Sequence, residues 1–291
     1  MGARVAHTAL DASHASVPAL LYAGLVAVTM LAVHPVVALA SLAGALACSA
    51  LTRGARATGR GLVWQLPMLA LVCLANPLFS ARGSTLVAKC GTVSVYAESL
   101  AYGATMGAVM VAVVVWLECA ACELTQDRLL SLMGGRARLL PLVTSMAAQL
   151  VPQLTARART VRATQLACTA AGVRPPRRAA LVRTSTMLMS WALEDSVGRA
   201  DAMRARGWES GRARTCYRPD RLRRRDVRDL ALLGVLMVAA AAGALLACAS
   251  WRFYPRMPEP GPWWALAPFS LLAAVPALAE LARRAREGRL A

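Results

Sequence analysis

The chain reads RLRRRDVRDLALLGVLMVAAAAGALLACAS over residues 221–250. Five arginines fall within its first eight residues, and the 21 residues from Leu230 to Ser250 carry no charge. A helix that spans the hydrocarbon core of a bilayer needs roughly 20 apolar residues, and arginines beside a span favour the cytoplasmic side. This stretch therefore predicts a membrane-spanning helix that follows a basic cytoplasmic segment.

Five other uncharged runs have a similar length and are rich in small and aliphatic residues. They are Val17–Val33, Pro35–Thr52, Gly61–Ser80, Ser99–Leu117 and Gly261–Ala279. Only 16% of the 291 residues are charged, whereas a soluble domain carries about a quarter. We therefore predict an all-α fold, a polytopic transmembrane helical bundle of about six spans, in which small residues let the helices approach closely.

The basic residues divide unevenly between the two sides of the membrane. With the N-terminus inside, 29 of the 33 basic residues lie in the cytoplasmic segments, which are the start, 53–60, 118–229 and the tail. The other four lie outside and are Arg82, Lys89, Arg252 and Arg256. The positive-inside rule thus predicts that both termini are cytoplasmic. It divides the chain into a four-span region (1–118), an arginine-rich cytoplasmic region (119–229) and a two-span region (230–291).

The net charge of +18 would also suit a protein that binds nucleic acid. The positive-inside rule already explains where the charges lie, so we predict no nucleic-acid partner. For the charged stretch Arg212–Asp229 we expect anionic lipid as the partner, because the cytoplasmic leaflet attracts basic segments.

The cytoplasmic region contains an uncharged stretch, Leu139–Leu154, with two prolines and two glutamines. A seventh span here would place most arginines outside, against the rule, so we interpret it as an amphipathic or protein-buried helix. Helical periodicity then predicts two amphipathic cytoplasmic helices, near Gln153–Ala171 and Arg183–Arg206, with Pro175-Pro176 between them. Each ends at a glycine suited to a helix C-cap, Gly172 and Gly207.

The second of these helices carries a recognisable motif. It reads Ser196-Val-Gly-Arg-Ala-Asp-Ala-Met-Arg-Ala-Arg-Gly-Trp208, and Arg214-Thr215 follows. This string resembles the signature of the transmembrane (T) component of energy-coupling factor (ECF) transporters, with Trp208 in place of the usual tyrosine. Similar family patterns occur in order over about residues 30 to 230, at His34-Pro35, Asn76-Pro77-Leu78-Phe79, Leu124-Thr-Gln-Asp127 and Val151-Pro152.

The resemblance implies a coupling subunit in the inner membrane of a bacterium. The two cytoplasmic helices would be coupling helices that bind two cytoplasmic ABC ATPase subunits, with Ala205, Arg206 and Gly207 docking into an ATPase groove. The spans would pass the ATPase motion to a small membrane substrate-binding (S) subunit. That partner would set the cargo, so the choice among a vitamin, cobalt and nickel stays open.

The family carries a second such triplet at the end of the earlier coupling helix. The corresponding residues here are Ala167, Cys168 and Thr169, so a cysteine stands where the family has arginine. Two explanations stay open. Either a neighbour such as Arg162 or Arg174 substitutes, or one ATPase of an asymmetric pair is held without this contact.

The chain lacks the residues of several enzyme classes. A Walker A motif needs a lysine, and the one lysine, Lys89, lies in an outside loop without the glycine pattern. We therefore expect a non-catalytic subunit with no cofactor, whose partners hydrolyse ATP. The pair Cys119 and Cys122 has no second Cys/His pair at metal spacing, so we predict no metal site.

Two alternatives remain from the residues alone. The first is a membrane-embedded enzyme of lipid metabolism that binds phosphate headgroups with the arginines of 199–228. Its candidate carboxylates are Glu194, Asp195 and Asp201. The second is a basic membrane scaffold that binds anionic lipid and nothing else. For Arg206 itself, the alternative to docking is that it faces solvent or lipid phosphate.

Overall fold

We describe a computed structural model of the chain at residues 13–79, 85–90, 93–133, 139–169, 176–208, 210, 222–251 and 263–289. The chain forms two compact units. The membrane unit comprises Met1–Leu129 and Asp220–Ala291, and the arginine-rich unit comprises Leu130–Pro219. The two predicted membrane regions, 1–118 and 230–291, thus fall together in the first unit.

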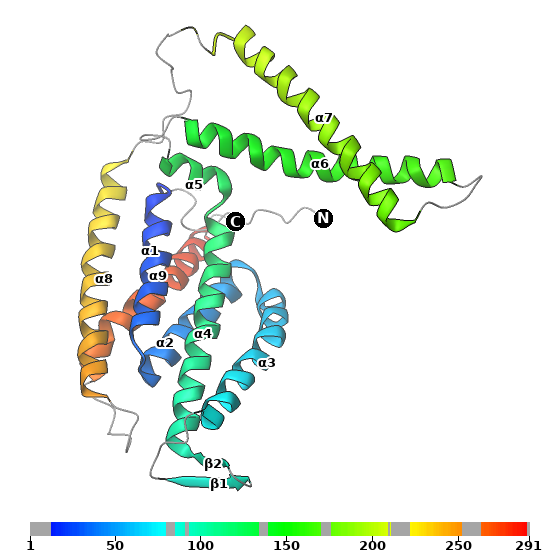
Figure 1. The fold of residues 1–291 in the computed structure, drawn as a ribbon. Coiled ribbons are helices and arrows are strands. Elements are labelled where there is room, and N and C mark those ends of the chain that lie inside the picture. The colour runs from blue at the N-terminus through cyan, green and yellow to red at the C-terminus, as the bar shows by residue number, and fades with distance from the viewer. Residues whose placement is uncertain are drawn as a thin grey trace. The chain divides into compact units, whose positions relative to one another are not determined.

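Each predicted apolar run coincides over most of its length with a helix of the membrane unit (Figure 1). The helices are α1 (Ser16–Leu31), α2 (Pro35–Thr52), α3 (Ala55–Phe79), α4 (Ala97–Glu123), α8 (Arg224–Ser250) and α9 (Trp263–Glu287). Within the described residues, α2, α3, α4, α8 and α9 are long and apolar enough to cross a membrane. The apolar α1 has 16 residues, slightly below the usual range. The prediction of an all-α, multi-pass membrane protein is confirmed.

Two short strands that the sequence did not predict lie between α3 and α4. The strands β1 (Leu86–Cys90) and β2 (Val93–Tyr96) pair antiparallel. Next to them, Glu98 at the start of α4 accepts a hydrogen bond from the Thr85 backbone N–H at 3.1 Å. A hydrogen bond therefore connects the residue just before β1 to the first turn of α4.

Along the chain, the ends of the helices lie alternately at one end and at the other end of the membrane unit. At one end of the membrane unit, His14 before α1 donates its backbone N–H to Asp226 of α8 at 3.3 Å, and Arg53 after α2 forms an ion pair with Glu118 of α4. At the other end, the His34 ring before α2 packs on the Trp251 ring after α8, with centroids 4.8 Å apart. The ends that arginine counting predicts to be cytoplasmic thus lie together, and we call this the basic end.

A hydrogen-bonded chain runs through the apolar core of the membrane unit. Trp116 of α4 donates Nε1–H to Ser41 Oγ of α2 at 3.0 Å, and Ser41 Oγ lies 2.8 Å from Thr29 Oγ1 of α1. Thr29 in turn donates to the Leu25 carbonyl oxygen at 2.7 Å. All four residues are fully buried. This series of hydrogen bonds therefore satisfies polar groups that would destabilise the core if they had no partner.

Small residues bring α8 and α9 into close contact, as the composition predicts. A Cβ added to Gly243 would lie 2.1 Å from the Ala265 carbonyl oxygen. No side chain fits at this distance, so glycine sets the separation of these two helices.

The arginine-rich unit contains α6 (Leu139–Thr169) and α7 (Arg177–Ala205), while α5 (Gln126–Met133) spans the boundary between the units. The predicted helix at Leu139–Leu154 is confirmed, and α6 continues without a break through the first of the two helices that we predicted to be cytoplasmic. Although α6 has 31 residues, it is not among the helices that are apolar enough to cross a membrane in the described residues. The predicted cap Gly172 and the separating Pro175 lie outside the described residues.

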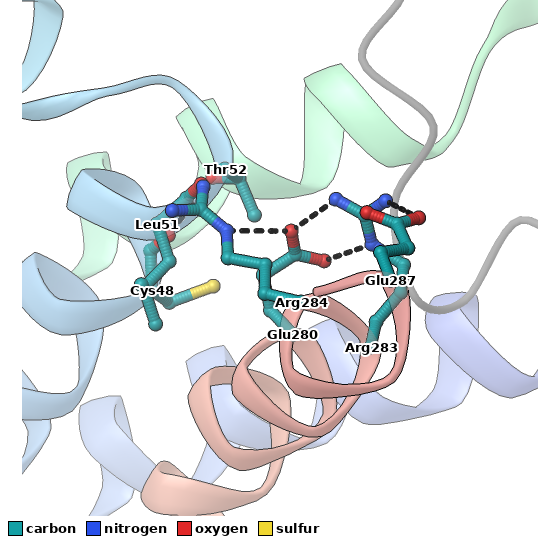
Figure 2. Close-up of polar contacts among 7 residues, drawn as sticks. All are labelled: Cys48, Leu51, Thr52, Glu280, Arg283, Arg284 and Glu287. Atoms are coloured by element: carbon teal, nitrogen blue, oxygen red, sulfur yellow. Dashed lines mark hydrogen bonds and ion pairs between the residues drawn. The ribbon is translucent and has the colours of Figure 1, made fainter. Parts of the chain in front are cut away.

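A network of charged side chains fastens the end of α9 to the end of α2 (Figure 2). The Glu280 side chain is only 3% exposed, and its carboxylate accepts hydrogen bonds from Arg283 Nη2 at 2.6 Å and from Arg284 Nε at 3.3 Å. Arg284 also donates to the carbonyl oxygen of Leu51, in the last turn of α2. Because Glu280 holds both guanidinium groups, it positions the contact between the two helices.

We expect Glu280→Gln to lower the free energy of unfolding of the membrane unit by about 2 kcal/mol, because a buried acceptor of two charged donors loses its charge. The matched control is Glu287→Gln. Glu287 binds Arg283 at 2.5 Å but is 60% exposed, so its loss should cost less than about 0.5 kcal/mol. Thermal unfolding in detergent measures both, and equal effects would contradict a special role for Glu280.

Candidate functional site

The two helices of the arginine-rich unit cross at a cluster that we call the crossing clasp, formed by Gln153, Arg157, Trp191, Asp195 and Arg199. The Arg157 guanidinium of α6 lies 4.3 Å from the centroid of the Trp191 ring of α7. Arg199 of α7 binds Asp195 at 2.5 Å and donates from Nη2 to Gln153 Oε1 of α6. These side chains border a hollow of about 460 Å³.

Helical spacing explains why these residues meet. Gln153 and Arg157 lie four residues apart on α6, while Trp191, Asp195 and Arg199 follow the same spacing on α7, so each set occupies one helix face. One face thus meets the other through a cation–π contact and a charge-assisted hydrogen bond. Arg199 belongs to the predicted motif, but its partner Gln153 was not predicted from the sequence.

The arginine-rich unit has little core of its own. Among its described residues, Thr184 is the one buried side chain. Large apolar side chains are instead exposed at Val143, Val151, Leu166, Leu181, Val182, Met187, Met189, Leu193 and Val197. Exposed apolar surface of this extent is typical of a surface that contacts a partner or lipid.

The helix α7 ends at the predicted glycine in a well-formed cap. Gly207 has φ +81°, a left-handed conformation that glycine adopts without strain. The Trp208 N–H donates to the Met203 carbonyl at 3.1 Å, and the Gly207 N–H donates to the Arg204 carbonyl at 2.9 Å. This pair of hydrogen bonds is a Schellman motif, and it fixes the backbone at the triplet Ala205, Arg206 and Gly207.

The cap presents Arg206 outward. All three residues of the triplet are exposed, and in the described part of the chain Arg206 has no ion pair or side-chain hydrogen bond. A planar guanidinium at the last turn of a helix suits a carboxylate or carbonyl partner. The arrangement leaves this cation available to another molecule.

A groove of about 300 Å³ runs between α6 and α7 beside the cap. Its apolar lining includes Val143, Met146 and Leu150 of α6 and Met203 of α7. Since the Met203 carbonyl also accepts the Trp208 N–H, the cap and the groove share a residue. The unit therefore joins an exposed cation to an apolar groove.

The first triplet lies at the end of α6, where Ala167 and Cys168 are exposed and the side chain of Thr169 is outside the described residues. Cys168 lines a second groove, of about 280 Å³, together with Arg183 of α7. Sequence reasoning named Arg162 and Arg174 as substitutes for the missing arginine. Arg162 is exposed on α6 and Arg174 lies outside the described residues, but Arg183 shares the groove with Cys168.

The carboxylates of the enzyme alternative do not form a cluster in the described residues. Asp195 binds Arg199, while Glu194 and Asp201 are exposed. In the parts of the chain that the structure describes, no group of three or more His, Cys, Asp or Glu side chains is placed to hold a metal ion.

Comparison with known protein families and with curated proteins returns no match for this chain. The resemblance to the ECF family therefore depends on the chain's own motifs.

Loss of the cation–π contact should loosen the crossing. Such a contact contributes about 0.5–1 kcal/mol at an exposed site, so we expect Arg157→Leu to raise amide hydrogen exchange in α6 and α7 about two- to fivefold near the clasp. Mass spectrometry of peptides around 150–165 and 185–200 measures the change.

The matched control is Arg159→Leu. Arg159 is an exposed arginine of α6 with no ion pair or hydrogen bond in the described residues. If both variants exchange alike, the clasp does not hold the two helices together.

Proposed function

We propose that this chain is the transmembrane coupling subunit of an ECF-type ABC importer in a bacterial inner membrane, with both termini in the cytoplasm. Two ATPase subunits would bind the arginine-rich unit, and a small membrane substrate-binding subunit would bind the membrane unit. The cargo would be a vitamin or a metal ion. The chain itself would be non-catalytic.

The observation that carries this proposal is the exposed Arg206 on a helix cap, which has no ion pair in the described residues. The Schellman motif fixes the backbone at Arg206, so that only the side chain loses conformational freedom on binding, which favours docking into a preformed groove. The ordered sequence motifs around it add the identity of the partner. The absence of a Walker A lysine from the whole sequence is consistent with ATP hydrolysis in separate subunits.

The connections between the units suggest where motion would enter the membrane. Arg128 of α5 donates from Nη2 to the Ser13 carbonyl oxygen at 3.1 Å. Asp226 of α8 accepts the His14 N–H at 3.3 Å. Arg128 lies two residues before the arginine-rich unit begins and Asp226 lies seven residues after it ends, so a residue on the membrane-unit side of each connection binds the segment just before α1. Displacement of the arginine-rich unit would therefore act first on α1.

The proposal predicts that Arg206→Glu abolishes ATPase binding. The full chain, tagged and co-expressed with its neighbouring genes, is purified in detergent. We expect an ATPase pair with the wild type and at least a tenfold loss in the variant, because a carboxylate repels an acidic or carbonyl-lined groove.

The matched control is Arg177→Glu, which makes the same charge change on an exposed residue at the opposite end of α7. Retention of the ATPases by Arg206→Glu together with full transport would refute docking at this cap. Failure of the wild type to retain any ATPase would favour the lipid enzyme or the scaffold, whose activities persist without ATPases.

A second variant tests the first triplet. We expect Cys168→Arg to be tolerated or to strengthen ATPase association, because the family has arginine here and the side chain is exposed. Retained ATPase from a titrated pull-down is the measurement. Loss of assembly would show that the first docking contact has been placed at the wrong residues.

A further inference from the structure

The helix α3 has two faces with different surroundings, one packed on α4 and the other exposed. Its inner face packs on α4, where Gln65 Nε2 donates to Glu118 Oε1 at 3.3 Å and Asn76 Nδ2 donates to the Ser99 carbonyl at 2.9 Å. The helix lies at the edge of the membrane unit beside α4 (Figure 1). Its other face is exposed along its whole length.

The exposed face carries its residues in a definite order. Arg56, Arg60 and Trp64 follow one another at intervals of four residues, so they lie on one face of the helix. Both arginines are exposed, and Trp64 is 84% exposed. Further along the same face, Leu71, Leu74 and Leu78 are exposed too. The order is two cations, one indole and then aliphatic side chains.

The cations are unpaired, in contrast to their neighbour. In the described residues, neither Arg56 nor Arg60 has an ion pair or a side-chain hydrogen bond. Arg53 precedes them by one helical turn but points inward, where it binds Glu118. Gly54 separates Arg53 from α3 with φ +90°, a turn that lets the chain leave α2 and start α3 at once. Inward and outward arginines are thus separated by a single tight turn.

The order along α3 matches the layers of a lipid leaflet. At 1.5 Å per residue, Trp64 lies about 6 Å beyond Arg60, and Leu78 lies about 21 Å beyond Trp64. Phosphate headgroups, the interface that tryptophan prefers and the hydrocarbon core follow in the same sequence. Side chains four apart on a helix have Cβ atoms about 5–6 Å apart, so Arg56 and Arg60 can share one phosphate, which guanidinium groups bind well.

We propose that the outer face of α3 binds an anionic phospholipid, with Arg56 and Arg60 on its phosphate, Trp64 at the glycerol level and Leu71, Leu74 and Leu78 along an acyl chain. Charge complementarity favours this occupant over zwitterionic lipid, because neither guanidinium group has an ion pair among the described residues. The site is independent of ATPase docking.

The test measures lipid binding by the purified full chain. In native mass spectrometry with phosphatidylglycerol, we expect Arg56→Gln/Arg60→Gln to lower the affinity of the tightest bound lipid about thirtyfold, since each basic residue near an anionic surface contributes about 1 kcal/mol. Phosphatidylcholine should bind both proteins equally weakly. Quenching by bromine-labelled phosphatidylglycerol, compared between wild type and Trp64→Phe, places the acyl chain beside Trp64.

The matched control is Arg286→Gln/Arg289→Gln, which removes two charges from exposed arginines at the same basic end. Thermal unfolding in phosphatidylcholine confirms that all variants are folded. An equal loss of affinity in both double variants would overturn the proposal, since general charge would then explain binding. Displacement of the lipid by glycerol phosphate would show a site for a soluble phosphate, and loss of a co-purified membrane protein with unchanged lipid affinity would show a protein interface. Either result would also overturn it.

Discussion

The membrane unit depends on keeping guanidinium groups out of the hydrocarbon core of the bilayer, where a charged side chain costs several kcal/mol. The chain has 32 arginines, and each one described in the membrane unit lies at the basic end. The alternating order of helix ends follows, because helices that start and finish beside arginines must place those termini on one side. Where an arginine turns inward, as Arg53 does, a carboxylate receives it.

The two units hold their helices together by different means. In the membrane unit, glycine contacts and a buried hydrogen-bonded chain fix the helix separations. In the described residues of the arginine-rich unit, a cation–π contact, a bridging arginine and a hydrogen bond from Thr184 to Gln165 connect the two helices, and large apolar side chains are exposed. Its interactions are each worth about 1 kcal/mol or less. The crossing of the two helices can therefore change at a small energetic cost, as the proposed coupling role requires.

Local sequence signals predicted the long helices, whereas contacts between distant residues could not be predicted from the sequence. The uncharged runs predicted the membrane helices because their length and composition are local properties, and Gly207 predicted the end of α7 because a cap needs few residues. The crossing clasp joins Arg157 to Trp191 and Gln153 to Arg199, and no pattern along the chain specifies which helix faces meet. Likewise, no pattern in the sequence predicts that Arg183 and Cys168 line one groove or that Arg284 donates to the Leu51 carbonyl. The strands β1 and β2 were missed because each is too short to show a period. The docking role of Ala205, Arg206 and Gly207 stays a prediction.

The nearly coreless arginine-rich unit also bears on the fate of single copies in a cell. Proteases and chaperones recognise exposed apolar segments, and this unit displays them on both of its helices as long as nothing covers them. If this chain is the coupling subunit proposed above, a copy without partners would be recognised and degraded, whereas a copy with its apolar surface covered would not. The number of subunits would then be balanced by degradation, without matched synthesis.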